Sequence, residues 1–436
     1  MYPIDIISLS REILPYAIEK RRYFHRHPEP TSKEFHTIHL ICNELDQLRI
    51  EYVNIRDGGV LGWIDGTAES EKNAPHVLLR ADCDALTMTE NSQNSKGTRC
   101  CISENPGFAH MCGHDSHMSM LLSAAKILSE MDKSQIKGRI YLLFERGEEG
   151  GNCIYYVMKY IQEQKIRIDS CFALHVDPDF PVGKYRFEDG PNHAGNVNFE
   201  IELIGKGGHG SRPDLSNNPL DCFISIMNQL KDVRLKYIPP ASLITYNIGS
   251  IQCGHKRNIV PECLEFKGTA RFYDTEAGRI FKEKLDAIIK TNSILYDCQP
   301  VYQVFSGPSL SLINHAGATA LAKEAVTELY GNDCLSNNQE PSLGSESFST
   351  LAAYYPSVMG RLGVRNEEKG MTAALHNPSF DLDEEAMQYG IAAHIAYALK
   401  YLETHPHFEF TPFNGDADAV LCYTNRPIPK HFDPTP

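Results

Sequence analysis

The stretch from Phe108 to His117 combines residue types that bind metal ions. Within it, Cys112 and His114 stand two residues apart, and the last eight residues contain three His, one Cys and one Asp. An amphipathic helical pattern follows directly, and the N-terminus of a helix favours the thiolate form of cysteine, which can share a metal ion with imidazole. Each of these residues alone is more often part of a capped helix start, but the cluster as a whole favours a metal site.

A second cluster, Glu145-Arg-Gly-Glu148-Glu149-Gly-Gly, comes directly after an apolar run that ends at Phe144. In an open α/β sheet, ligands gather beyond the carboxyl ends of the strands, which is where this loop would lie. Two adjacent carboxylates can divide the work, because one can bind a metal ion while its neighbour acts as a general base. A pair of glutamates is usually a solvated turn, but the strand end and the glycines that follow favour the chemical interpretation.

Two further strand ends carry polar side chains. Asp82 and Asp84 follow the apolar run Val77–Leu79, and His175 follows the run Cys171–Leu174. The aspartates could simply bond to turn backbone, and a lone histidine is more often a hydrogen-bonded core residue than a ligand. Four such clusters, which together offer Cys, His, Asp and Glu, are nevertheless explained most simply by one metal site.

The hydrophobic pattern predicts the elements that must position these clusters. The strand candidates are compact apolar runs at Val77–Leu79, Ile140–Phe144 and Cys171–Leu174. Thr31 and Glu34 form a capping-box pattern that predicts a helix from Thr31 to Leu48. Asp115 is the expected N-cap of the amphipathic helix that follows the Cys112 cluster. Strands that alternate with helices predict an α/β sheet.

The pattern changes after residue 190. Apolar and polar residues alternate from Val197 to Leu203, and a helix is expected from Pro219 to Leu230, so this part reads as a small α+β insertion. Helices from Ala316 to Tyr330 and from Ala386 to Leu402 resume the α/β style, which predicts one split catalytic domain around the insertion. The expected divisions are residues 1–190, 191–300 and 301–403, and an irregular surface tail over 404–436.

The composition excludes several classes of function. The 436 residues include 42 Lys and Arg against 56 Asp and Glu, and the formal charge of −14 argues against nucleic acid or an anionic membrane as the main partner. No apolar run approaches the ~18 residues that span a bilayer, and we expect no signal peptide. The 13 cysteines are scattered without regular spacing, so we expect a cytoplasmic protein rather than a disulfide framework.

Taken in order along the chain, these motifs resemble the M20 metallopeptidase family, and within it the amidohydrolases that include aminoacylases, hippurate hydrolases and auxin-conjugate hydrolases. Besides the clusters above, the resemblance rests on Arg21-Arg-Tyr-Phe-His-Arg-His-Pro-Glu29, Gly205-Lys-Gly-Gly-His209, Asn258-Ile-Val-Pro261, Gly344-Ser-Glu-Ser-Phe348 and Leu375-His-Asn-Pro378. Each segment alone is weak evidence, but the combination is specific. The implied fold is α/β and zinc-peptidase-like, with a mixed sheet flanked by helices and the insertion acting as a lid or dimerisation domain.

The resemblance implies two divalent metal ions and names the residues of their site. The implied ligands are Cys112, His114, Glu149, His175 and His376, with Cys112 as the bridging ligand. The other implied site residues are Glu148 as general acid and base, Asp84 as the partner that orients a ligand, His209 as an oxyanion-stabilising histidine, and Asn258 and Arg271 as partners of the substrate carboxylate. In dimeric relatives the histidine acts from the neighbouring subunit, so a homodimer or larger homo-oligomer is implied as well.

The implied reaction is hydrolysis of the amide bond of N-acyl amino acids, dipeptides or related small amides. Glu148 would take the proton of a water acidified by the ions and return it to the leaving amine, while His209 would stabilise the oxyanion. Thiolate and imidazole suit Zn, whereas carboxylate and imidazole also accept Mn, Co or Ni. Two other interpretations stay open: a catalytically silent relative that acts as a sensor or scaffold, and a protein in which the metal only ties strand ends together.

Three segments depart from the family pattern. The common Gln-Pro-Ala before the glutamate pair is Glu145-Arg146-Gly147 here, Asn152-Cys153 stands where glycine and alanine are usual, and Ser347 replaces an aspartate. Either the pocket has altered electrostatics and an unusual substrate, or Glu145 and Arg146 pair with each other as a structural salt bridge. The histidines that we assign mainly to structural roles are His25, His27, His36, His110 and His117.

Overall fold

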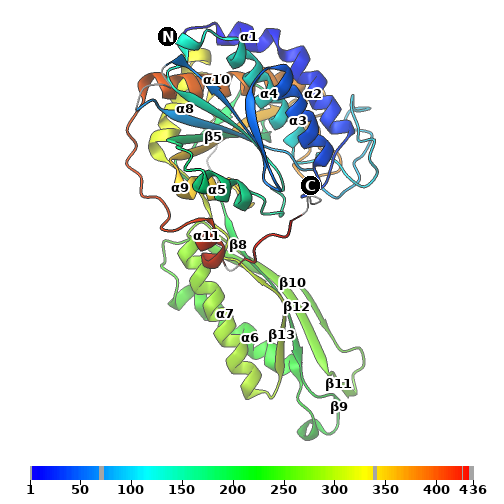
Figure 1. The fold of residues 1–436 in the computed structure, drawn as a ribbon. Helices are drawn as coiled ribbons and strands as arrows, with labels where there is room; N and C mark the ends of the chain where they lie inside the picture. Colours follow the sequence, from blue (N-terminus) through cyan, green and yellow to red (C-terminus); the bar gives the residue numbers. More distant parts are fainter. Residues whose placement is uncertain (1, 68–72, 337–340, 425, 432–436) are drawn as a thin grey trace.

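Two sheets lie toward opposite ends of an elongated molecule, each with helices packed against it (Figure 1). The computed structural model describes residues 2–67, 73–336, 341–424 and 426–431. One sheet has seven strands and is mixed, and the other has four antiparallel strands. The larger sheet carries the predicted strand ends at which the candidate ligands gather.

The seven-stranded sheet has the order β1-β2-β4-β3-β5-β15-β6. Its strands are β1 (Glu51–Ile55), β2 (Gly59–Asp65), β3 (His76–Asp82), β4 (Arg139–Glu145), β5 (Ser170–Pro181), β6 (Tyr185–Arg186) and β15 (Ser357–Arg365). β3 pairs in parallel with both β4 and β5, and β15 pairs in parallel with β5. The carboxyl ends of these four strands therefore meet at one edge of the sheet, and the predicted α/β class with a mixed sheet is confirmed.

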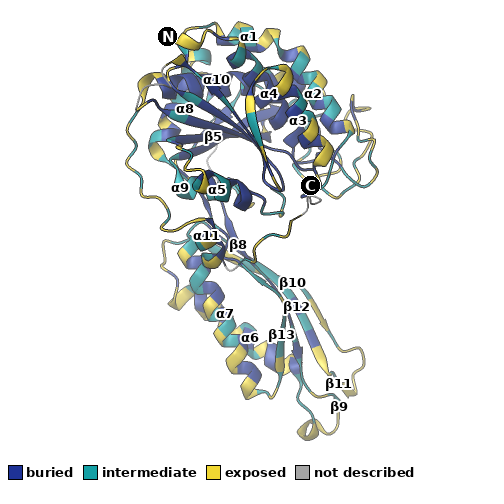
Figure 2. Cartoon of the chain, viewed as in Figure 1, coloured by how far each residue is buried: buried dark blue, intermediate teal, exposed yellow. Residues whose placement is uncertain are grey.

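Side chains of each central strand alternate between two apolar cores, one on each face of the sheet. On β3, Val77 and Leu79 pack into one core while Leu78 packs into the other. The helices of the first face are α1 (Ile6–Glu12), α2 (Leu14–Arg26), α3 (Phe35–Gln47), α4 (His114–Glu130), α8 (Ala316–Tyr330) and α10 (Met387–Thr404). Those of the second face are α5 (Ile154–Glu163), α9 (Ser349–Tyr354) and, near the C-terminus, α11 (Ala417–Tyr423). Figure 2 shows the sheet between them as largely buried.

Two predicted helix starts are wrong. The helix α3 begins at Phe35 rather than Thr31, because the Glu34 side chain bonds to Arg146 and to the backbone N–H of Gly147 instead of closing a capping box. The helix α4 begins at His114 with Gly113 as its N-cap, so Asp115 lies inside the first turn. Gly113 has a φ of 87°, and a Cβ there would lie 2.4 Å from Val176 Cγ2, so this abrupt entry into the helix requires glycine.

The smaller sheet has the order β10-β12-β8-β13. Its strands are β8 (Gly195–Ile204), β10 (Ile244–Cys253), β12 (Cys263–Phe272) and β13 (Gln299–Ser306). The helices α6 (Pro219–Lys236) and α7 (Thr275–Leu295) pack on the face to which the alternating apolar residues of β8 point. Two short pairs complete the strands, β9 (Gly208–His209) with β11 (Ile259–Val260) and β7 (Gly190–His193) with β14 (Leu312–Asn314). β13 crosses residue 300, where the sequence places the end of the insertion, and the division into domains stays a prediction.

The segment after α10 is not wholly irregular, contrary to expectation. It contains α11 (Ala417–Tyr423), whose Ala417 and Leu421 pack into the second core beside α5. The Tyr155 hydroxyl donates to Asp418 at 2.6 Å, which ties the two helices together. Within the described residues, no helix combines the length and apolar character needed to cross a bilayer.

Candidate metal centre

The five predicted metal ligands meet at the carboxyl edge of the large sheet. Cys112 Sγ lies 3.2 Å from His376 Nε2 and 3.4 Å from His175 Nε2. His376 Nε2 also lies 3.2 Å from Glu149 Oε1. Ligand atoms of His114 approach both Cys112 and Glu149 closely enough for shared coordination. A thiol at the centre of three imidazoles and a carboxylate is therefore present without any rearrangement of the chain.

The unsatisfied atoms of this cluster fit a cation. His114 Nδ1 contacts the backbone oxygen of Asp84 at 2.9 Å, which directs Nε2 into the cluster. Among the described residues, His114 Nε2 and Glu149 Oε1 are buried atoms without a hydrogen-bond partner. Such orphaned groups are costly unless another partner is supplied, and soft thiolate with imidazole and carboxylate suits divalent Zn and its neighbours. The residues present thus fit the expected metal ions.

Asp84 holds two of the candidate ligands in place. Its Oδ1 lies 3.2 Å from His114 Nδ1, and its Oδ2 accepts a hydrogen bond from the backbone N–H of Glu149 at 2.9 Å. Thr31 Oγ1 donates to the same Oδ2 at 2.7 Å. These contacts suit the expected orienting role, because a carboxylate on the far ring nitrogen fixes the tautomer of a metal-ligating histidine.

Backbone geometry delivers the remaining ligands. His376 adopts a φ of 61°, uncommon for a residue with a side chain, and its N–H donates to the Met111 oxygen at 2.8 Å. The Glu148–Glu149 turn follows Gly147, whose φ is 65° and whose N–H donates to Glu34 Oε1 at 2.9 Å. Both features place a ligand beside Cys112: glycine adopts the positive φ freely at position 147, whereas His376 does so at a cost in local strain.

The surroundings perturb the protonation of the cluster. Burial raises the pKa of the Cys112 thiol, so that a bound cation is required to hold it as thiolate at neutral pH. Burial, followed by the nearby carboxylates of Glu346 and Glu149, raises the pKa of Glu148 well above its ordinary range. Glu148 Oε1 accepts one hydrogen bond, from the backbone N–H of Ser347 at 3.2 Å. A carboxyl group with a raised pKa beside metal ligands is suited to carry protons.

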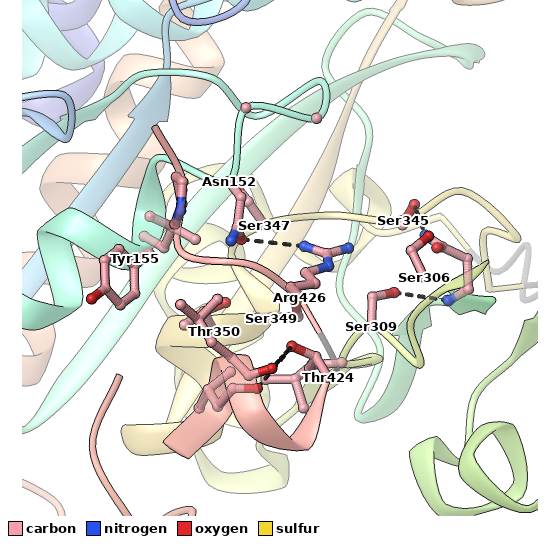
Figure 3. Close-up of a pocket in the computed structure, with 18 of the residues that line it drawn as sticks. Asn152, Tyr155, Ser306, Ser309, Ser345, Ser347, Ser349, Thr350, Thr424 and Arg426 are labelled. Atoms are coloured by element: carbon pink, nitrogen blue, oxygen red, sulfur yellow. Dashed lines mark hydrogen bonds between the residues drawn. The ribbon is translucent and has the colours of Figure 1, made fainter. Parts of the chain in front are cut away.

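An open cavity of about 560 Å³ adjoins this cluster. Its lining combines Glu148 and Glu149 from the sheet edge, Arg271 from the small sheet, and Ser345 from the loop before α9. Arg271 Nη1 donates to Ser345 Oγ at 3.2 Å. Further lining residues come from the C-terminal segment, for which the sequence leaves open a position over the pocket or over a dimer surface (Figure 3). The cavity has the size and mixed lining of a small-molecule site.

The structure does not bring His209 and Asn258 to the cluster. His209 is paired with Ile259 in the β9–β11 ribbon, and the Asn258 oxygen accepts from the backbone N–H of Gly210. Both residues line a separate hollow at the end of the small sheet that lies far from the large one (Figure 1). Of the three site residues expected from the insertion, Arg271 alone lines the metal-side cavity within one chain.

The structural role expected for His117 agrees with its contacts. Its Nδ1 lies 2.6 Å from Asp82 Oδ1, and its Nε2 accepts a hydrogen bond from the backbone N–H of Val176 at 3.0 Å. Both ring nitrogens are thereby engaged, although His117, Asp82 and His114 lie close enough together to suggest a ligand group.

Of the two alternatives left open for Glu145 and Arg146, the one in which they pair with each other is wrong. Arg80 Nε donates to Glu145 Oε2 at 2.8 Å, whereas Arg146 Nε donates to Glu34 Oε2 at 3.0 Å. Ser347 Oγ donates to Glu145 Oε1 at 2.5 Å and accepts from Arg80 Nη2 at 2.9 Å. Measured against the pattern that the resemblance implies, Glu145 brings a carboxylate to the contact with Arg80 in which Ser347 has none, and we infer that these two departures compensate each other.

This compensation predicts the result of a charge exchange. Glu145→Gln is expected to destabilise the fold by about 2 kcal/mol, because Arg80 loses a buried charged partner. Adding Ser347→Asp should recover at least half of that loss, since it restores one carboxylate to the contact. Urea unfolding of both variants measures the effect, with exposed Glu403→Gln as the control. A double variant no more stable than Glu145→Gln alone would contradict the compensation.

Comparisons with known proteins agree with the presence of a metal site. The model of Peptidase family M20/M25/M40 matches residues 78–400. "Thermostable carboxypeptidase 1" of Saccharolobus solfataricus is 30% identical over 393 residues, covering 90% of this chain and 96% of that protein. "IAA-amino acid hydrolase ILR1-like 4" of Arabidopsis thaliana is 27% identical over 411 residues, covering 92% and 89%. The crystal structure of Bacillus subtilis YXEP protein, described as a dinuclear metal binding peptidase from M20 family, has a TM-score of 0.72 at 25% identity and covers 90% of this chain and 99% of that chain.

Proposed function

The chain belongs to Peptidase family M20/M25/M40 and is a metal-dependent hydrolase of amide bonds, and from that premise we propose that its substrates are N-acyl amino acids or closely related small amides. One observation carries the proposal: His114 Nε2, a buried atom without a hydrogen-bond partner among the described residues, lies close to Glu148 and Glu149, and both glutamates line an open cavity. Structural metal sites are usually closed sets of four ligands. Five ligands beside an accessible carboxyl group instead suit a catalytic site.

The side chains divide the proposed reaction among them. Cys112, His114, Glu149, His175 and His376 would hold two divalent ions, Zn or else Mn, Co or Ni, which when bound acidify water and polarise a carbonyl oxygen. Glu148 takes the proton of the attacking water and gives it to the departing amine. Asp84 keeps His114 oriented, and Arg271 binds the carboxylate of the amino-acid part.

We propose that His209 and Asn258 act from a second copy of the chain. The hollow that holds them lies away from the metal cluster of their own chain, so they are available to a neighbour. The smaller sheet and its helix α6 also expose large apolar side chains, including Leu220 (39%) and Ile224 (49%) on α6 and Ile251 (51%) on β10. These side chains are available for contact with another copy.

Mixing two inactive variants tests this arrangement. His209→Ala and Glu148→Gln should each be nearly inactive alone, because each lacks one member of every site. Co-expressed and assembled at random, they should recover about a quarter of wild-type activity, since half of the dimers then contain one complete site. Activity assays on the unfractionated co-expressed protein, with each variant alone as control, measure the recovery, and the purified mixed dimer should show about half of wild-type activity. A mixed dimer without recovered activity would place His209 in its own chain's site.

The substrate proposal is tested by metal analysis followed by a hydrolysis screen. The panel contains N-acetyl, N-benzoyl, indoleacetyl and p-aminobenzoyl amino acids and dipeptides, with Glu148→Gln as the inactive control. We expect bound divalent metal and turnover of at least one acyl class. Bound metal with no hydrolysis across the panel would favour the sensor or scaffold alternative instead.

We also propose a reducing compartment, the cytoplasm, for this protein. All 13 cysteines are free, including the buried Cys112 that the metal site needs as thiolate. A thiolate ligand is incompatible with disulfide formation at the same sulfur.

A further inference from the structure

The C-terminal segment forms one wall of the catalytic cavity. Val420, Leu421 and Thr424 of the α11 region and Arg426 beyond it line the same cavity as Glu148 (Figure 3). This segment lies after residue 400, where the match to the family model ends. The wall is therefore a feature of this chain that the shared family motifs do not specify.

Arg426 places a cation in this wall without a charged partner. Its Nη1 donates to the neutral Asn152 Oδ1 at 3.2 Å, and its backbone N–H donates to the Leu421 oxygen at 3.0 Å. In the described parts of the chain, no carboxylate lies within ion-pair distance of the guanidinium group, and burial alone lowers the pKa of Arg426. A guanidinium group carries five N–H donors, so most of them stay free toward the cavity.

Arg271, which lines the same cavity, also lacks a charged partner in the part of the chain that the structure describes. Its side chain has one bond, to Ser345, and no carboxylate partner among the described residues. The three acidic groups of the cavity lining have other partners: Glu346 lies 3.0 Å from Arg80, Glu149 belongs to the metal cluster, and Glu148 accepts a hydrogen bond from the backbone N–H of Ser347. Two half-buried arginines thus share one cavity with no anion of the protein to neutralise them, and a bound anion would offset their desolvation.

A purely structural role for Arg426 explains less. Its bond to Asn152 ties the C-terminal segment to the loop that follows Glu149. A neutral amide, however, compensates poorly for burying a full charge, and a glutamine or lysine could form the same tether. A tether does not require the planar guanidinium group, whose remaining N–H donors are unused. The planar arrangement of these donors matches the two oxygens of a carboxylate.

We propose that Arg426 binds a second carboxylate of the substrate, so that the preferred substrates are amides bearing two carboxylates, one held by Arg271 and the other by Arg426. The inference rests on the proposed amidohydrolase function, in which Arg271 takes the carboxylate of the amino-acid part. The second carboxylate belongs either to the amino-acid side chain or to the acyl group. Asn152 Oδ1 accepts a hydrogen bond from Nη1 of Arg426, and this bond fixes the direction of the other N–H groups of the guanidinium.

Charged substrates and their neutral isosteres test the proposal. The pairs are N-acetyl-L-glutamate against N-acetyl-L-glutamine, and N-succinyl-L-alanine against N-succinamoyl-L-alanine. The wild type should favour the dicarboxylate of at least one pair by about tenfold or more in kcat/KM, and Arg426→Gln should bring that ratio close to one, mainly through KM. Arg426→Lys should keep part of the preference. Exposed Lys430→Gln removes a charge from the same segment and should leave the ratio unchanged.

Two kinetic outcomes would overturn the proposal: no preference for the dicarboxylate in either pair, or an Arg426→Gln variant that lowers both members of a pair equally. A binding measurement separates this inference from the proposed function. Calorimetry with metal-loaded Glu148→Gln compares the two members of each pair, before and after Arg426→Gln is added. Tighter, Arg426-dependent binding of the dicarboxylate of either pair, without any turnover by the wild type, would sustain the subsite and refute the amidohydrolase function. Equal binding of the two members in both pairs would refute the subsite.

Discussion

Replacing Glu148 with Gln is expected to lower kcat by about 10²- to 10⁴-fold while the protein keeps its metal ions. The amide of glutamine is nearly isosteric with the carboxyl group, but it can neither take a proton from water nor pass one to an amine. Glu148 has the raised pKa of a buried group near the carboxylates of Glu346 and Glu149, as proton transfer near neutral pH requires. Steady-state kinetics and elemental analysis of the same preparation measure both quantities.

The adjacent residue provides the matched control. Glu149→Gln removes the same charge one position along the chain, but Glu149 Oε1 lies beside His376 Nε2 among the proposed ligands. This variant should lose metal as well as activity, whereas Glu148→Gln should lose activity alone. Near wild-type turnover by Glu148→Gln would remove the basis for the proposed proton transfer.

Removal of the metal ions is expected to abolish hydrolysis and to lower the temperature of unfolding. Chelation would leave the buried Cys112 thiol and His114 Nε2 without their partner, and ions that bind only the folded protein stabilise it by mass action. Dialysis against a chelator, followed by activity assays and differential scanning calorimetry, measures both effects. Adding back Zn, Mn, Co or Ni one at a time should restore both quantities and identify the preferred ion.

A cysteine substitution localises this effect to the cluster. Cys112→Ala should prevent restoration, because it removes the sulfur that contacts both His175 and His376. Cys42→Ala removes another buried thiol, on α3 and outside the cluster, and should bind metal normally. If chelated protein stayed active, or if Cys112→Ala bound metal as tightly as the wild type, the centre would lie elsewhere.

Local sequence pattern predicts the elements well where burial alone decides them. The runs that end at Leu79, Phe144 and Leu174 lie within β3, β4 and β5, because each side of these strands meets an apolar core. The local pattern fails where a side chain forms its hydrogen bonds with a residue that is distant in the sequence. Glu34 satisfies the capping-box pattern, yet it is taken by Arg146, more than a hundred residues away.

The candidate site divides in the same way. The close spacing of Cys112 and His114 indicates a pair of metal ligands. His376, in contrast, lies 264 residues from Cys112 along the chain and is predicted only through the family resemblance. Arg426 carries no local signal at all, since a single arginine in a proline-rich tail looks like solvent-exposed charge. Its place in the cavity depends on α11 packing against α5, which is tertiary information.

The contact between Glu145 and Ser347 has a consequence for mutational coupling as well as for stability. Both side chains contact Arg80, and Ser347 Oγ also donates to Glu145, so the effect of changing one of these residues depends on which residue stands at the other position. A double-mutant cycle on the two positions should therefore give a coupling energy that differs from zero. In genetic terms the pair is epistatic: a substitution tolerated at one position depends on the residue present at the other.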